Sequence, residues 1–171
     1  MRILKFSAKS RLAVLLTALT LVFFLASVDR AKALPPDACS LLNPTQLEKI
    51  LGQPFELSNR SLAPASAPGQ PAGRECDYTA QKGGSRKVVL IAFVDGSAAQ
   101  ARETYDKLSL WLSPKAKVDG GWDVAYMDDN HAIHVLKGKV RYYINIVPFG
   151  TANSEKEKKL KDLAGCVAEQ I

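Results

Sequence analysis

The sequence predicts an α+β domain in which helices pack on an antiparallel sheet of five or six strands. Residues 34–171 are long enough to form one domain with its own hydrophobic core. Apolar residues form strand-like runs at 87–94 and 140–147, and each run is followed by apolar residues at helical spacing. Two hairpin-then-helix units in series favour helices packed on an antiparallel sheet, and they are consistent with an internal duplication.

The first 33 residues have the features of a signal peptide. Four basic residues among the first eleven precede an almost wholly apolar run from Leu12 to Val28. Ala31-Lys32-Ala33 fits the small-x-small cleavage pattern, which predicts cleavage between Ala33 and Leu34. The alternative is an uncleaved anchor, because the apolar run just reaches the lower length limit of a membrane span. We therefore expect an exported protein, periplasmic or secreted, that keeps no stable membrane span after cleavage.

The net charge of the chain comes mainly from this signal segment. The whole sequence carries a formal charge of +6, with 23 basic and 17 acidic side chains. Six of those basic residues but only one acidic residue lie before residue 34, so the remaining domain is almost neutral. A nucleic-acid-binding domain usually carries a strongly basic surface. We therefore expect no nucleic-acid partner.

The first element of the domain is a short helix over residues 44–51. Asn43 and Gln46 stand at the two positions of a capping box, and Pro44 suits the first helical position. Gly52 is a typical helix-ending residue. The segment 62–73 that comes later is rich in Pro, Ala, Ser and Gly, and this composition predicts a flexible loop.

A hairpin and a longer helix follow that loop. The segments 75–80 and 87–94 read as strands joined by a glycine turn. The second strand, KVVLIAFV, is apolar at both odd and even positions, which predicts a central strand covered on both faces. Ser97 and Gln100 form a second capping box, so we expect a helix over 97–112.

The second half repeats this order. Residues 122–127 alternate weakly, and the segments 132–136 and 140–147 flank Lys137-Gly138-Lys139 as a hairpin. A final helix is expected over 154–169, because apolar residues recur there at helical spacing.

Three cysteines, Cys39, Cys76 and Cys166, follow the signal. An oxidising compartment favours one disulfide and one free cysteine. We predict the bond Cys39–Cys76, because it would close the loosely structured segment between the first helix and the first strand. The pair Cys39–Cys166 is the alternative.

Several short motifs are similar to those of a family of exported bacterial domains of unknown function. Asp37-Ala38-Cys39-Ser40-Leu41-Leu42 resembles the Cys-x-Leu-Leu opening of that family, and Cys76-Asp77-Tyr78 resembles its second cysteine with a following aromatic residue. The segment 120–126 resembles its Gly-x-Gly-Asp-x-Ala-Tyr turn, although Trp122 stands in place of the second glycine. The resemblance implies a compact α+β domain in the cell envelope, and it supplies no catalytic residues.

One segment concentrates residues that can bind metal or move protons. Asp128-Asp129-Asn130-His131 is followed closely by His134. Residues three apart on a regular strand point to opposite faces, so a polar turn with surface histidines is the preferred interpretation over a metal site. No catalytic residue, metal or cofactor is therefore predicted.

Four aromatic residues raise the alternative of a ligand groove: Trp111, Trp122, Tyr142 and Tyr143. Packing in the core is the preferred interpretation of these side chains.

The sequence thus favours a non-catalytic, exported cell-envelope domain that binds an unidentified partner or small ligand. The alternative is a hydrolytic enzyme whose scattered site uses His131 or His134 as the base. An apolar or aromatic groove would favour binding. A cluster of titratable groups around either histidine in a concave pocket would favour the enzyme.

Overall fold

The computed structural model describes residues 37–65, 71–82, 85–111, 116–148 and 154–171. The predicted signal peptide and the Ala33–Leu34 cleavage site lie outside these ranges. The helical elements are η1 (Ala38–Ser40), α2 (Pro44–Leu51), α3 (Ala98–Trp111) and α4 (Ser154–Gln170). The strands are β1 (Phe55–Ala63), β2 (Gly73–Ala80), β3 (Lys87–Val94), β4 (Ala116–Lys117), β5 (Val124–Met127), β6 (Ile133–Lys137) and β7 (Val140–Val147).

The fold is α+β, as predicted, and its strands form one antiparallel sheet in the order β1-β2-β3-β7-β6-β5-β4. The sheet has seven strands, so the prediction of five or six was wrong. The two strands that the sequence pattern missed, β1 and β4, stand at the edges of the sheet. The middle of β1 is polar and contains a bulge between Leu57 and Asn59, while β4 has only two residues. Neither strand carries a clear alternation of apolar residues.

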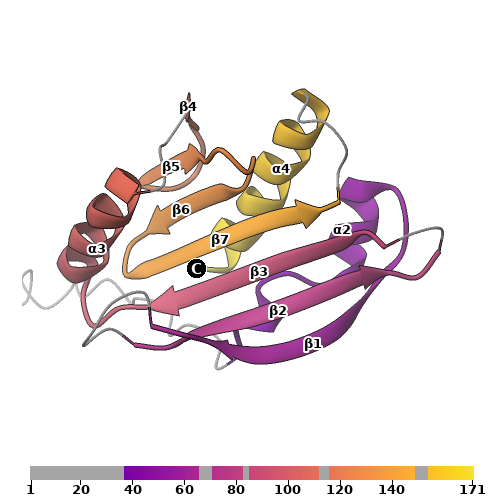
Figure 1. The fold of residues 1–171 in the computed structure, drawn as a ribbon, viewed down its shortest axis with the longest axis horizontal. Coiled ribbons are helices and arrows are strands. Elements are labelled where there is room, and N and C mark those ends of the chain that lie inside the picture. The colour runs from indigo at the N-terminus through magenta and orange to yellow at the C-terminus, as the bar shows by residue number, and fades with distance from the viewer. Residues whose placement is uncertain (1–36, 66–70, 83–84, 112–115, 149–153) are drawn as a thin grey trace, which may run out of the picture. The chain divides into compact units, whose positions relative to one another are not determined.

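The two faces of the sheet are covered unequally (Figure 1). Helices α2 and α4 lie together behind the sheet in that view, and their apolar residues join the main core with alternate residues of the strands. Helix α3 packs on the opposite face, where Ala101 and Tyr105 contact Tyr126 of β5 and Leu136 of β6. The two hairpin-then-helix units therefore place their helices on opposite faces.

The central strand β3 is covered on one face only. Val88, Leu90 and Ala92 are buried in the main core, whereas the alternate side chains on the other face are half-buried. The prediction that β3 is covered on both faces was therefore wrong for the face that carries α3. That helix lies over β5, β6 and part of β7, so it leaves the apolar outer face of β3 partly open.

Most predicted boundaries match the structure closely. Asn43 and Gln46 form the reciprocal capping box of α2, and Gly52 ends this helix in the left-handed conformation. The predicted loop over 62–73 is too long, because β1 continues to Ala63 and β2 begins at Gly73. A side chain at Gly73 would displace the Phe93 ring, since an added Cβ would lie 2.6 Å from it.

Candidate functional site

The open face of the sheet carries a groove of about 390 Å³, which we call the β3–β7 groove. It lies on the part of this face that α3 does not cover, next to that helix. Most of the side chains that line it are apolar. The outer face of β3 has the composition of a buried strand face, but it presents Val, Ile and Phe to solvent. Its lining residues are Val89, Ile91 and Phe93 of β3, Leu108 of α3, His134 of β6, and Tyr143, Asn145 and Val147 of β7.

Aromatic rings close the end of the groove under α3. His134 stacks on Tyr126 with ring centroids 4.9 Å apart, and it makes an edge-to-face contact with Tyr143, also with centroids 4.9 Å apart. Tyr105 meets Tyr126 edge-on at 5.3 Å and donates a hydrogen bond to the His134 carbonyl. A small cavity of about 50 Å³ continues beneath α3 among these rings. The groove therefore has an aromatic end wall whose rings contact one another.

His134 is fixed by a hydrogen-bonded carboxylate. Its Nε2 lies 2.9 Å from Oδ2 of Asp128, and Oδ1 of Asp128 accepts bonds from the backbone N–H groups of Asn130 and Ala132. Burial alone would raise the pKa of Asp128, but the bonds from His134 and from the two backbone groups lower it below its ordinary value. Asp128 thus stays ionised, closes the turn 128–132 and orients the His134 ring.

A second buried ion pair holds the start of α3 next to the sheet. Nε of Arg141 lies 2.7 Å from Oδ2 of Asp95, and both side chains are almost fully buried. The Arg141 guanidinium also lies over the Phe93 ring, 4.9 Å from its centroid. Because Asp95 neutralises Arg141, this cation adds no net charge to the groove.

The sequence-predicted polar residues are only partly brought together. His131 lies in the turn before β6, and its Nδ1 is 4.0 Å from Oε1 of Glu157 on α4, whereas His134 faces α3. The two histidines therefore belong to different surroundings. Within the described residues, no group of three or more His, Cys, Asp or Glu side chains is placed to hold a metal ion.

The four aromatic residues that could have formed a ligand groove lie in different parts of the structure. Tyr143 lines the β3–β7 groove, as the ligand-groove alternative proposed, while Tyr142 is buried and donates a hydrogen bond to the Ala164 carbonyl of α4. Trp122 packs on the face that carries α2 and α4, and the side chain of Trp111 lies outside the described part of the structure. Burial raises the pKa of Tyr126 to about 12, so this phenol stays neutral near neutral pH.

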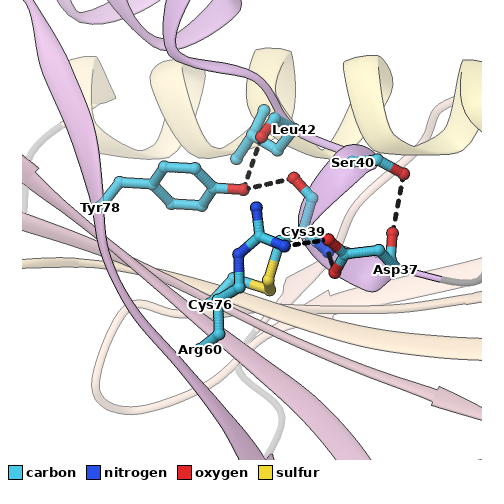
Figure 2. Close-up of polar contacts among 7 residues, drawn as sticks. All are labelled: Asp37, Cys39, Ser40, Leu42, Arg60, Cys76 and Tyr78. Carbon is cyan, nitrogen blue, oxygen red and sulfur yellow. Dashed lines mark hydrogen bonds and ion pairs between the residues drawn. A yellow bond between two sulfur atoms is a disulfide. The ribbon is translucent and has the colours of Figure 1, made fainter.

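The predicted disulfide joins Cys39 of η1 to Cys76 of β2, with Cα atoms 5.5 Å apart (Figure 2). The Tyr78 hydroxyl beside it lies 2.9 Å from the Cys39 carbonyl and 2.5 Å from the Leu42 carbonyl. Arg60 of β1 pairs with Asp37, whose other oxygen caps η1 through the Cys39 N–H. These contacts tie the start of the domain to the sheet, which is a structural role.

The third cysteine, Cys166, keeps a free thiol. It lines a groove of about 710 Å³ between α2, α4 and the turn that carries Trp122. Burial raises the pKa of this thiol, and the carboxylates of Glu169 and Asp162 raise it further. A thiol that stays protonated is a poor nucleophile, so Cys166 does not have the setting of a reactive cysteine.

The β3–β7 groove was not predicted from the sequence, although the apolar residues of β3 that line it were recognised. Val89, Ile91 and Phe93 were assigned to a covered strand face, because periodicity shows which residues are apolar and not what packs on them. The groove residues come from two separate stretches of the chain, β3 with α3 and β6 with β7, and only the fold brings these stretches together.

Comparison with known proteins adds no relative to this description. No family model, curated protein or solved structure matches the chain. No helix in the described ranges is long and apolar enough to cross a membrane.

Proposed function

We propose that this chain is an exported, non-catalytic binding domain whose β3–β7 groove holds a small ligand with an apolar body. The supporting observation is the apolar outer face of β3, which a central strand normally buries and which α3 leaves half-exposed here. A groove of about 390 Å³ falls in the size range of small-molecule sites. Its aromatic end wall and few polar groups also match such sites.

Binding of the neutral fluorophore Nile red to residues 34–171 tests this proposal. Ile91 lies in the middle of the groove, opposite Tyr143, so Ile91→Glu places a charge where the apolar body would lie. We expect this substitution to weaken Nile red binding at least tenfold, because the charge would have to be desolvated.

Leu110→Glu is the matched control. Leu110 is also a large apolar residue, 84% exposed on α3, and it does not line the groove. Circular dichroism would verify that both variants are folded. Equal Nile red affinity in folded Ile91→Glu and wild-type protein would contradict the proposal.

A hydrolytic enzyme is the second candidate, and the His134–Asp128 pair beside the groove favours it. A histidine held by a carboxylate can act as a general base. However, Nε2 of His134 is engaged by Asp128, the ring lies between two tyrosines, and the lining residues of the groove include no Ser, Thr or Cys nucleophile. Hydrolysis of 4-nitrophenyl butyrate that His134→Gln abolishes would favour the enzyme over the binding domain.

We also propose export to an oxidising compartment, and membership of the exported bacterial family that the motifs resemble. The Cys39–Cys76 disulfide supports the first part, since such bonds persist in oxidising surroundings. Mass spectrometry of the native protein should find Leu34 as its first residue. A retained Met1 would favour the membrane-anchor alternative.

A further inference from the structure

We infer that the ligand of the β3–β7 groove carries a positive charge, which lies over β2 beside the groove. This inference rests on the proposed function, since it assigns a charge to the ligand of the same site. Side chains of β2 continue the open face of the sheet beyond β3. Antiparallel pairing places Glu75 directly opposite Ile91, and Asp77 directly opposite Val89. Side chains in such pairs have Cβ atoms about 4.5–5.5 Å apart.

The orientation of both carboxylates follows from the alternation of β2. Cys76 and Tyr78 are buried in the main core, so Glu75 and Asp77 point to the other face, where the groove lies. The row Glu75–Ile91–Tyr143 thus runs from a carboxylate across the apolar floor to an aromatic ring. The row Asp77–Val89–Asn145 runs parallel to it.

Neither carboxylate is neutralised by a cation within the described part of the chain. Oδ1 of Asp77 is buried and has no hydrogen-bond partner there. A carboxylate oxygen buried without a partner is costly, so the charge of Asp77 is left uncompensated, and a cation bound beside it would stabilise that charge. The described ion pairs include neither Glu75 nor Asp77.

The remaining charges near the groove do not reverse this balance. Arg141 is paired with Asp95, and Asp128 adds a further carboxylate behind His134. Lys87, opposite Val147 on β7 and Thr79 on β2, is the cation on the open face of β3, and it lies diagonal to Asp77 without forming an ion pair with it. Glu56 of β1 lies on the same face, opposite Thr79. The surroundings are therefore acidic, and they favour an amphiphilic cation over a neutral or an anionic amphiphile.

Three probes with the same alkyl chain separate the charge of the ligand from its apolar body. Octylamine, octanol and octanoate are cationic, neutral and anionic near neutral pH, and each would be titrated as a competitor of Nile red in residues 34–171. We expect octylamine to bind most tightly, octanol next and octanoate least. Octylamine should exceed octanoate by about tenfold at low salt, and added salt should reduce this difference.

Substitution of the two carboxylates locates the charge. Glu75→Gln and Asp77→Asn should each weaken octylamine binding about two- to fivefold and leave octanol binding unchanged. Glu48→Gln is the matched control, because Glu48 is an exposed carboxylate on α2, which covers the other face of the sheet. It should change neither affinity.

The outcomes distinguish this inference from the proposed function. Octanoate binding as tightly as octylamine, or octylamine binding unchanged by both carboxylate substitutions, would overturn the cationic ligand and leave the apolar groove intact. Nile red binding that ignores Ile91→Glu would overturn the groove itself. A second copy of the chain would be the occupant instead if sedimentation showed a dimer that Ile91→Glu dissociates.

Discussion

At the scale of single residues, Asp128 links the local fold to the groove. Its carboxylate closes the turn 128–132 through two backbone bonds and holds His134, which forms part of the aromatic end wall. The sequence pattern identified a polar turn here, and the structure contains one. It could not identify the pairing with His134, because that pairing depends on the register of β5, β6 and β7, which places the His134 ring between Tyr126 and Tyr143.

Asp128 should make the stability of the domain sensitive to acid. Its pKa is lowered in the folded state, so its contribution is present above the ordinary carboxyl pKa and is lost as the pH falls through the folded pKa. Asp128→Asn should lower the free energy of unfolding by about 1–3 kcal/mol near neutral pH, and by less at about pH 2. Urea unfolding at both pH values measures this difference.

Asp119→Asn serves as the control, because the Asp119 side chain is 90% exposed. Its effect should stay within about 0.5 kcal/mol at either pH. An Asp128→Asn variant with the same pH profile as the wild type would contradict the role of the carboxylate.

At the scale of elements, the ring of Trp122 packs closely on the backbone of the turn that leads into β5. The Trp122 ring lies against Gly120, and Nε1 of Trp122 donates a hydrogen bond to the Val118 carbonyl. The sequence motif marked this turn as unusual, because Trp122 stands where the resembled family has a glycine. The structure places the ring over the glycine that remains.

Gly120→Ala should therefore destabilise the domain. The added Cβ would lie 2.3 Å from the Trp122 ring, so the ring must shift, and we expect a loss of about 1–3 kcal/mol in unfolding free energy. Gly121→Ala is the matched control, because nothing lies within 4 Å of its added Cβ. Thermal unfolding of the two variants measures the difference. Equal melting temperatures would show that the ring does not constrain the turn.

The disulfide acts between elements as well, since it joins η1 to the central part of β2. Replacing both Cys39 and Cys76 by Ala should lower the free energy of unfolding by about 2–5 kcal/mol, measured by urea unfolding. Replacing Cys166 by Ala should cost less, because that side chain is only half-buried. Non-reducing peptide mapping that links Cys166 to either other cysteine would contradict the pairing.

At the scale of the whole molecule, the sequence predicted the fold class and the three α-helices, because caps, turns and apolar spacing are local signals. It also predicted the disulfide, from the cysteine count and the segment that the bond would close. The edge strand β1 escaped prediction because its bulge and polar middle weaken the alternation. The open face of β3 was not predicted, for a different reason. Which face α3 covers depends on tertiary packing, and the same apolar pattern fits a covered and an open strand. The internal duplication stays a prediction.

The central claim is that the open face of the sheet, and not another surface, binds an apolar ligand. Its most direct test is amide chemical-shift mapping of isotope-labelled residues 34–171 during titration with octylamine. We predict the largest shifts at Val89, Ile91, Tyr143 and Asn145, with smaller ones at Glu75 and Asp77. Largest shifts around Ile50, Trp122 and Cys166, in the groove between α2 and α4, would contradict the claim.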